Sequence, residues 1–315
     1  MLPPLLAALA IALPAMAQSQ PTPRLRGVTT TLEITPVLLA AGHDPGGVEV
    51  GRGGIPDLFA SDTALRADLA THAETQALRN SVDHPDLRII LTVSEGLYRI
   101  VGRRSAGIER VEDLKGKRIA YPPLTSAAFY LHKMLATAGL AEKDVILIPF
   151  TKDLLAGGQV DAAVYWEPES QAAFDSFGAD AIELYRPGVY RERYNLNATA
   201  ASLADPAKRK RIVAFVRGVI RAACDLRADP SEGWSLAAAS GRRPVHEVAR
   251  SWGRQVYPAY LPSDLLEVMV EEEVWLARLG DRPARDRQQL AALIDPTVLR
   301  EALAEPIAAP DGRRC

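Results

Sequence analysis

Short apolar runs alternate with amphipathic stretches along most of the chain before residue 197. The runs are four to seven residues long, as strands are, and the stretches between them carry apolar residues at the three- and four-residue spacing of helices. We predict strands at 27–32, 48–51, 67–71, 87–93, 97–103, 118–121, 144–150, 160–166 and 181–185. Each unit returns the chain to a new strand, which predicts an α/β protein with mostly parallel sheets.

The clearest helix begins at Thr125 or Ser126 and ends at Gly139, and shorter helices are predicted at 36–41, 74–80, 152–156 and 169–177. After Asn197 the pattern becomes purely helical. Helices are predicted there at 211–224, 245–252, 264–279 and 284–293, with prolines between them. Helices that follow a finished sheet usually wrap it.

The first residues have the pattern of an export signal. Residues 2–15 form an uncharged apolar run, and Ala15, Met16 and Ala17 fit the small-x-small rule for cleavage. The segment before the run carries no Lys or Arg, and the run is short for a membrane span, which needs about 20 apolar residues. We assign residues 1–17 to a signal peptide cleaved after Ala17 and expect a soluble periplasmic or secreted protein.

Composition is that of an ordinary globular protein. The chain of 315 residues is 48% hydrophobic and 24% charged, with a net charge of -2, which argues against disorder and against a nucleic-acid partner. Its two cysteines, Cys224 and Cys315, form no Cys-x-x-Cys motif, so no sulfur-based metal or redox site is predicted, and no cofactor. They are able to pair in an oxidising compartment, but the terminal position of Cys315 favours a frayed, dispensable thiol.

One strand ends in an unusual tip. The sequence GGQVDAAVYWEPE (157–169) is a glycine turn, a short apolar strand and then Trp166, Glu167 and Pro168. In open α/β sheets, ligands bind in the crevice beyond the carboxyl ends of the strands, so an aromatic side chain and a carboxylate there indicate a binding site. The alternative is a core tryptophan followed by a Glu-Pro pair that starts a helix.

Three segments in order resemble the solute-binding components of ABC importers. They are VEDLKGKRIAYPPLTSAAFYLHKMLATAGL (111–140), DVILIP (144–149) and LLAGGQVDAAVYWEPE (154–169). The resemblance is to the subgroup that receives alkanesulfonates, taurine, nitrate or thiamine-precursor pyrimidines, and it extends from about residue 27 to the helix at 211.

The resemblance implies a type II periplasmic-binding fold, with two α/β lobes, a hinge, a ligand cleft and C-terminal helices packed on the first lobe. We expect lobe 1 at 25–101, lobe 2 at 102–195 and a return to lobe 1 at 196–315, with crossings near 97–102 and 196–201. It also implies a monomeric receptor for a small anionic or heteroaromatic solute, with a membrane permease and its ATPase as partners.

Candidate ligand contacts lie where strand ends and helix starts face the cleft. The set is Thr30, Thr31, Glu33, Gly53, Gly54, His72, Glu74, Thr125, Ser126, Trp166, Glu167, Arg193 and Asn195. Free N–H groups where a helix opens at Thr125 favour an anion, and the alternative is a simple N-cap. Arg193 is able to pair with an anionic solute, but a solvated loop is the favoured account of that segment. Glu167 beside an anion would be repulsive unless it points away or pairs with an arginine, whereas an aromatic ring with a carboxylate suits a planar, hydrogen-bonding or cationic ligand.

Two other classes compete with a receptor. An enzyme is disfavoured because no G-x-S-x-G elbow or P-loop is present, and the His246-Glu247 start of an H-E-x-x-H motif meets Arg250 in place of the second histidine. The three glutamates at 271–273 are expected to form a solvated helix face. A sensing module of a regulator should carry a helix-turn-helix or a membrane span, and the sequence shows neither.

Overall fold

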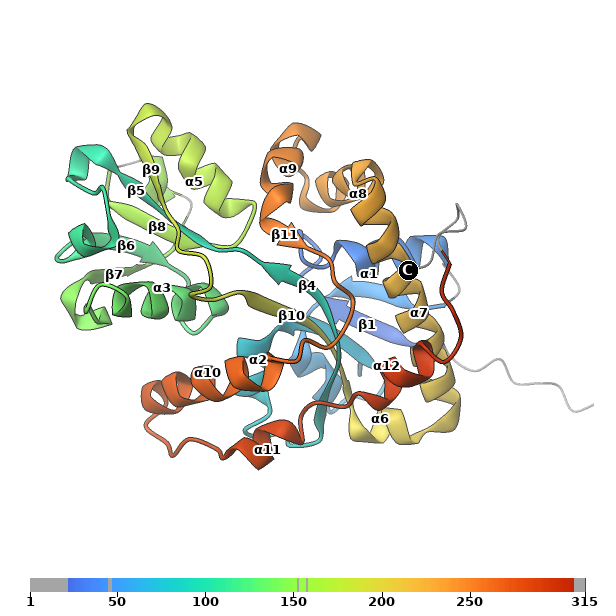
Figure 1. The fold of residues 1–315 in the computed structure, drawn as a ribbon. Helices are drawn as coiled ribbons and strands as arrows, with labels where there is room; N and C mark the ends of the chain where they lie inside the picture. Colours follow the sequence, from blue (N-terminus) through green and yellow to red (C-terminus); the bar gives the residue numbers. More distant parts are fainter. Residues whose placement is uncertain (1–21, 45–46, 152, 157, 309–314) are drawn as a thin grey trace, which may run out of the picture.

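The computed structural model describes residues 22–44, 47–151, 153–156, 158–308 and 315, and the predicted signal peptide lies outside them. These residues form two lobes, each built on one sheet (Figure 1). Lobe 1 holds a six-stranded sheet in the order β11-β4-β10-β3-β1-β2, made of β1 (Arg24–Gly27), β2 (Glu49–Arg52), β3 (Leu69–Ala73), β4 (Leu87–Gly96), β10 (Glu192–Thr199) and β11 (Gln255–Val256). Lobe 2 holds a five-stranded sheet in the order β7-β6-β8-β5-β9, made of β5 (Arg99–Arg103), β6 (Arg118–Tyr121), β7 (Ile146–Pro149), β8 (Ala162–Tyr165) and β9 (Ala181–Leu184).

Helices cover both sheets. Those of lobe 2 are α3 (Ser126–Ala136), α4 (Asp153–Ala156) and α5 (Glu169–Phe177). Those of lobe 1 are α1 (Thr35–His43), α2 (Glu74–Asn80), α6 (Ala200–Ala204), α7 (Pro206–Ala228), α8 (Ser231–Gly241), α9 (Val245–Ser251), α10 (Leu265–Leu279), α11 (Arg287–Ala291) and α12 (Thr297–Ala302). Short 3-10 turns include η1 (Ile55–Phe59), η4 (Glu142–Asp144) and η6 (Trp252–Arg254).

The predicted α/β class is confirmed, but the expected mostly parallel sheets are mixed. Strands β1, β2 and β3 are parallel to one another, as are β6, β7 and β8, whereas β10 is antiparallel to β3 and β4, and β5 is antiparallel to β8 and β9. The first strand also ends at Gly27, where 27–32 was expected, and a turn leads from it into α1.

The sequence pattern missed strand β10, as it missed β11 and the helices α6, α8 and α12. All eight of its residues are buried although its sequence, ERYNLNAT, is mostly polar. Neighbouring strands supply partners for some of these polar groups: Thr92 Oγ1 donates to Asn195 Oδ1 (2.8 Å), and Asn197 Nδ2 donates to the Ala70 carbonyl oxygen (3.2 Å). A polar run that is paired inside a sheet gives no apolar signal to read.

The chain passes between the lobes twice. The first crossing lies between β4 and β5, at residues 97–98, and the second lies between β9 and β10, at residues 185–191. The boundaries expected at 101/102 and 195/196 therefore fall inside β5 and β10. The return crossing comes earlier than predicted because β10 already belongs to the sheet of lobe 1.

The C-terminal helices pack on lobe 1 as expected. The long helix α7 is capped by Asp205, whose carboxylate accepts from the backbone N–H groups of residues 207 and 208, and its buried stripe faces the sheet together with α1 and α12. That stripe matches the predicted one: Ile212, Val216, Val219, Ile220 and Ala223. Two C-terminal helices also contact lobe 2: α9 through the Arg250–Asp175 ion pair and α10 through the Trp275 ring, which lies near Phe129. The sequence did not predict these contacts.

Cys224 and Cys315 are joined by a disulfide, with 5.6 Å between their Cα atoms. The expectation of a frayed thiol at the C-terminus is wrong. Ile307 is buried in the core of lobe 1, to which α7 contributes, and the backbone N–H of Cys315 donates to the Ile307 carbonyl oxygen (3.0 Å).

The expected solvated face at 271–273 is also wrong for two of its three glutamates. Glu272 and Glu273 are fully buried. Although burial opposes it, hydrogen bonds from Arg282 and Arg285 lower the pKa of Glu273 to about 2. Within the described residues, no helix is long and apolar enough to cross a bilayer, and no group of three metal-binding side chains is assembled.

Candidate functional site

A cavity of about 40 Å³ lies between the two lobes, and we call it the cleft. Lobe 1 contributes Val28, Thr31, Glu33, His72, Ala73 and Gln76; lobe 2 contributes Thr125, Ser126 and Trp166; strand β10 contributes Glu192 and Tyr194. Six of these were predicted as ligand contacts: Thr31, Glu33, His72, Thr125, Ser126 and Trp166. The structure thus brings residues far apart in the sequence to one place.

The cleft forms where strands end and helices begin. Thr31 and Glu33 lie in the turn between β1 and α1, His72 lies near the end of β3, and Trp166 directly follows β8. Thr125 is the N-cap of α3, and its Oγ1 accepts from the backbone N–H of Ala128 (3.4 Å). These are the positions at which open α/β sheets bind ligands.

Two buried carboxylates define the chemistry of the cleft. Glu33 is 2% exposed and Glu192 is 3% exposed. On each side chain, Oε2 has no hydrogen-bond partner among the described residues. Burial raises the pKa of Glu33 to about 7, and burial together with the nearby Glu33 raises the pKa of Glu192 well above its usual range. Buried carboxylate oxygens without partners are costly unless a ligand satisfies them.

The N-terminus of α3 already faces a carboxylate of the protein. Ser126 Oγ lies 2.8 Å from the Tyr98 hydroxyl and donates to Glu192 Oε1 (3.1 Å). The positive end of this helix, which the sequence analysis considered for a bound anion, is therefore turned toward Glu192. None of the described residues that line the cleft is a Lys or Arg.

His72 and Trp166 complete the wall. The Nδ1 atom of His72 accepts from the backbone N–H of Ala73 (3.0 Å), and burial, with Arg79 nearby, lowers the pKa of His72 to about 4, so its ring is neutral. Trp166 is half-buried and packs on Tyr165, with 3.9 Å between ring centroids. The cleft is therefore lined by two aromatic side chains, Trp166 and Tyr194, one neutral imidazole and two carboxyl groups.

Glu167 points away from the cleft. It is 2% exposed, Arg99 Nη2 lies 2.8 Å from its Oε1, and its Oε2 accepts from the backbone N–H of Gln171 (3.1 Å). Burial nevertheless leaves its pKa raised. Glu167 thus holds the segment that carries Trp166 and does not line the cavity.

Six further candidate contacts also lie outside the cavity lining: Thr30, Gly53, Gly54, Glu74, Arg193 and Asn195. Gly54 lies beside His72, and a Cβ atom there would be 3.3 Å from the His72 ring. Arg193 is on the opposite face of β10 from Glu192, and Asn195 is buried inside the sheet. Glu74 is buried behind the cleft, where burial raises its pKa to about 7 and it accepts from the Tyr190 hydroxyl.

The sequence analysis missed Val28, Ala73, Gln76, Glu192 and Tyr194 as lining residues. The last two were missed with β10 itself, since side chains two apart share a face only in a strand. Gly96 leaves room for one of them, because a Cβ atom there would lie 2.6 Å from Glu192 Oε2. Had residues 192–199 been predicted as a strand, its alternation would have indicated both Glu192 and Tyr194 as lining residues.

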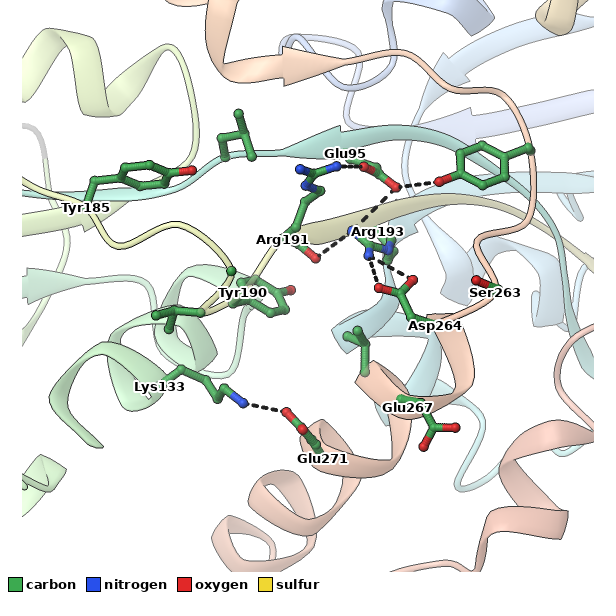
Figure 2. Close-up of a pocket in the computed structure, with 15 residues that line it drawn as sticks. Glu95, Lys133, Tyr185, Tyr190, Arg191, Arg193, Ser263, Asp264, Glu267 and Glu271 are labelled. Atoms are coloured by element: carbon green, nitrogen blue, oxygen red, sulfur yellow. Dashed lines mark hydrogen bonds and ion pairs between the residues drawn. The ribbon is translucent and has the colours of Figure 1, made fainter. Parts of the chain in front are cut away.

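A larger groove of about 580 Å³ lies on the other side of β10 (Figure 2). We call it the rear groove; its lining includes Glu95, Lys133, Arg191, Arg193, Asp264 and Glu271. Its charges are paired: Arg191 and Arg193 flank Glu95 at 2.6 and 3.5 Å, and Arg193 Nη2 donates to both carboxylate oxygens of Asp264 (3.0 and 2.8 Å).

Two α/β lobes joined by two crossings, with a cleft at the strand ends, define the type II periplasmic-binding fold. The model of the NMT1/THI5 like family matches residues 56–233, more than half of the chain, so the chain belongs to that family. The resemblance inferred from residues 111–169 is confirmed for both family and fold.

A Haemophilus influenzae protein named "Putative thiamine biosynthesis protein" is 27% identical over 182 residues. That match covers 54% of this chain and spans 56% of the relative's length. Among solved structures, the alkanesulfonate-binding protein SsuA from Xanthomonas axonopodis pv. citri, bound to MOPS, has a TM-score of 0.69 at 19% identity, over 88% of this chain and 99% of that one. The periplasmic aliphatic sulphonate binding protein SsuA from Escherichia coli has the same TM-score at 16% identity, over 86% and 92%.

An enzyme shares this fold as well. A mutant of DszB, in complex with biphenyl-2-sulfinic acid, has a TM-score of 0.60 at 16% identity, over 90% of this chain and 99% of that one. At these identities each likeness shows the fold alone. The function must therefore be argued from the cleft.

Proposed function

We propose that this protein is the extracytoplasmic solute receptor of an ABC importer, which captures a small organic ligand by closing its two lobes. The observation that carries the proposal is a cleft lined from both lobes, including strand β10 directly after the second crossing, with two buried carboxyl groups whose Oε2 atoms lack a hydrogen-bond partner among the described residues. Two crossings joining separate sheets allow hinge motion, and closure around a ligand would give a transporter a form to recognise. Partners of this kind are a permease and its ATPase, and we expect a monomer.

The proposed solute is a planar, nitrogen-rich molecule that donates hydrogen bonds or carries positive charge. Glu33 and Glu192 would accept from its N–H groups, and Trp166 would cover its ring. Of the two solute classes that the resemblance implies, the cleft favours the heteroaromatic one, because the described lining residues offer an anion no cationic side chain.

Capture requires the lobes to separate. A cavity of about 40 Å³ holds one or two waters. Sites for organic ligands measure roughly 300 to 1,000 Å³. We therefore infer that this arrangement is a closed one and that a solute would enter an open one.

The proposed location is the periplasm or the medium outside the cell. An export signal cleaved after Ala17 would place the chain there, and the Cys224–Cys315 disulfide fits an oxidising compartment. The alternatives are an enzyme of the same fold acting on a small pyrimidine-like substrate, and a ligand-sensing module. Turnover of a bound compound would favour the enzyme.

Native mass spectrometry of freshly purified protein tests the proposal by detecting a retained small molecule. A thermal-shift panel of aminopyrimidines, amidines, sulfonates, taurine and nitrate complements it, since a ligand at about 100 times its Kd stabilises by about 2.7 kcal/mol. Binding of a nitrogen base should strengthen from pH 5 to pH 8 as Glu33 loses its proton, whereas binding of an oxyanion would weaken over that range. No stabilisation by any compound, together with turnover, would reject the receptor function.

Trp166→Ala should weaken binding of the responding compound by tenfold or more, about 1.4 kcal/mol, since stacking on an aromatic ring contributes about 1 to 3 kcal/mol. Trp234→Ala is the matched control, because Trp234 is also half-buried but lies in a cluster of lobe 1 away from the cleft. Calorimetric affinity and melting temperature are measured for both. Unchanged affinity with a large loss of stability in Trp166→Ala would assign this tryptophan to the core.

A further inference from the structure

The two lobes meet along two flanks of the cleft. On one flank α10 of lobe 1 lies against α3 of lobe 2, and we call it the α3–α10 flank (Figure 1). On the other, α9 and η6 of lobe 1 face α5 and β9 of lobe 2, and we call it the α5–α9 flank (Figure 1). The two flanks are held by different forces.

The α3–α10 flank is apolar. The rings of Phe129 on α3 and Trp275 on α10 lie 5.4 Å apart, and both side chains are almost fully buried. They belong to one hydrophobic cluster that takes Leu131, Met134 and Leu135 from α3 and Leu265, Met269 and Leu276 from α10. Trp275 Nε1 also donates to Glu142 Oε1 in η4 of lobe 2 (3.1 Å). Separating these helices would expose large apolar side chains to water.

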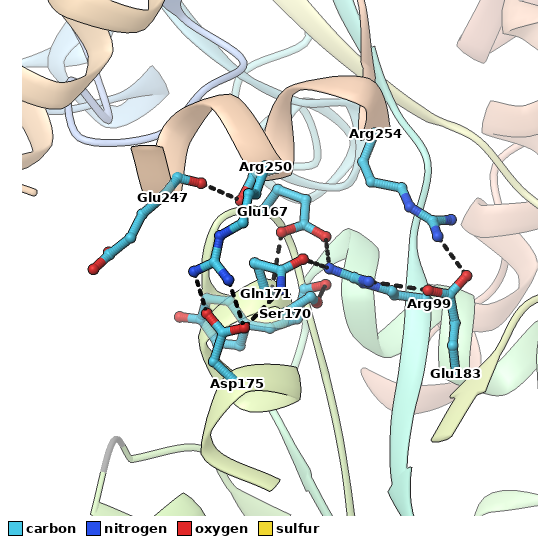
Figure 3. Close-up of polar contacts among 11 residues, drawn as sticks. Arg99, Glu167, Ser170, Gln171, Asp175, Glu183, Glu247, Arg250 and Arg254 are labelled. Carbon is cyan, nitrogen blue, oxygen red and sulfur yellow. Dashed lines mark hydrogen bonds and ion pairs between the residues drawn. The ribbon is translucent and has the colours of Figure 1, made fainter. Parts of the chain in front are cut away.

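The α5–α9 flank is ionic. Three arginines of lobe 1 each pair with a carboxylate of lobe 2: Arg243 with Glu169, Arg250 with Asp175 and Arg254 with Glu183. The first pair is 2.8 Å long, and Arg250 binds both oxygens of Asp175, at 3.1 and 2.6 Å (Figure 3).

The apolar side chains on this flank do not merge across it. Ala173 and Phe177 of α5 pack into the core of lobe 2, whereas Val248 of α9 packs with Leu32 and Ala237 of lobe 1. These sets form separate clusters among the described residues. The ion pairs are therefore the main contact, and pulling them apart would let water hydrate each charge with little apolar exposure.

The ionic flank is connected to both walls of the cleft. Glu183 pairs with Arg99 as well as with Arg254, and Arg99 in turn pairs with Glu167, the neighbour of Trp166 (Figure 3). On the lobe 1 side, Gln255 follows Arg254 and its Nε2 donates to Glu33 Oε1 (3.5 Å). Movement at this flank would carry Trp166 away from Glu33.

We propose that the lobes open on the α5–α9 flank, that the α3–α10 contact stays closed and acts as the pivot with the crossing strands, and that the three arginine pairs are a latch favouring the closed form. The latch shifts the balance between open and closed populations without contacting the solute. Salt screens exposed ion pairs more than partly buried ones, so raising the ionic strength should favour opening chiefly by weakening the exposed Arg250–Asp175 pair.

The test measures opening directly and needs no solute. Ser126 lines the cleft and is 2% exposed, so in a Ser126→Cys background Ellman's reagent reaches the thiol only when the lobes part. Both native cysteines are held in a disulfide and do not react. Arg250→Glu places a second negative charge opposite Asp175 and should speed labelling about five- to tenfold. Adding Asp175→Arg restores an opposite-charge pair and should return the rate to its starting value.

Lys133→Glu is the matched control, because Lys133 and Glu271 form an exposed ion pair at 2.5 Å on the α3–α10 flank. Its labelling rate should stay within twofold of the parent, and 0.5 M salt should speed labelling of the parent more than that of Arg250→Glu. Equal acceleration by both variants, no acceleration by Arg250→Glu, or no rescue by Asp175→Arg would overturn the latch. The inference deepens the proposed function and rests on it for its purpose, but the rates are measured whether or not any solute binds, so the two fail separately.

Discussion

Strand β10 separates two hollows of very different size and character. Side chains alternate at the start of this strand, so that Glu192 and Tyr194 face the cleft, while Arg193 and the preceding Arg191 face the rear groove. The rear groove, at about 580 Å³, is far larger than the cleft, at about 40 Å³. Size alone would therefore choose the rear groove as the functional site.

Whether the charged groups have partners argues for the cleft instead. In the rear groove Glu95 lies between Arg191 and Arg193, and Lys133 pairs with Glu271 (Figure 2). In the cleft, Glu33 and Glu192 keep oxygens without partners among the described residues. Paired charges hold a fold together, whereas unpartnered buried carboxylates lower its stability and are expected where a ligand supplies the missing contact. The difference teaches that the pairing of the carboxylates, more than volume, distinguishes the two hollows.

Glu95→Gln should give the largest effect that separates the structural role of the rear groove from the binding role of the cleft. It leaves the buried Arg193 short of one partner, and we expect the free energy of unfolding to fall by about 3 kcal/mol, with solute affinity unchanged. Urea denaturation measures the loss. The control is Glu267→Gln in the same groove, where the pair with Arg287 is more than half exposed and should contribute about 1 kcal/mol or less. Equal stability of Glu95→Gln and the parent would show that the rear groove is not structural.

Cys224→Ser tests a stabilising contact remote from both hollows. The disulfide closes a loop with a sequence separation of 91, and its loss should cost about 2 to 4 kcal/mol. Because Cys224 lies on α7, solute binding should not change. The parent protein treated with reductant should melt at the temperature of Cys224→Ser. If reduction leaves the melting temperature where it was, the tail is dispensable after all.

Glu33→Gln should change the free energy of unfolding least of these variants, controls apart, and at pH 8 it should increase it rather than lower it. The folded protein holds the proton of Glu33 more tightly than the unfolded chain, since burial raises its pKa from 4.5 to about 7. This stabilisation is complete below about pH 4.5 and is lost as the pH rises through about 7. At pH 8 Glu33→Gln should therefore be more stable than the parent by about 1 to 2 kcal/mol, and its stability should depend less on pH.

Glu273→Gln controls for that experiment because Glu273 is equally buried but its pKa is lowered to about 2. Its carboxylate contributes stability above about pH 4.5 that is lost as the pH falls toward 2, so the variant should be less stable at neutral pH. Melting temperatures between pH 4 and pH 8 compare the two. A Glu33→Gln protein that is less stable than the parent at pH 8 would mean that Glu33 is satisfied inside the protein.

Much of lobe 2 could be predicted from the sequence. The predicted ranges 118–121 and 169–177 coincide with β6 and α5, and Thr125 caps α3 as expected. These elements carry strong local signals: short apolar runs, a capping hydroxyl and helical spacing. The same signals placed Trp166 and Ser126 at strand and helix ends, and both line the cleft.

Local signals failed where a residue's role depends on distant partners. Asn195 and Asn197 look like loop residues, yet both lie inside a sheet, where Asn195 accepts a hydrogen bond from Thr92 and Asn197 donates one to the Ala70 carbonyl oxygen. Glu272, with Thr75 donating to it, is buried in place of the expected solvated face. Cys315 pairs with Cys224, which lies 91 residues away in the sequence, and no local pattern indicates that pairing.

By itself the sequence determined the α/β class, the family and most strand and helix positions, because these follow from spacings within a few residues and from ordered motifs. Only the tertiary structure decided that Glu192 faces the cleft while Arg193 faces away from it, that Glu167 pairs with Arg99, and that one flank between the lobes is ionic and the other apolar. The reason is physical: a polar side chain's partner and burial are fixed by contacts between segments distant in the chain, and no local pattern records them.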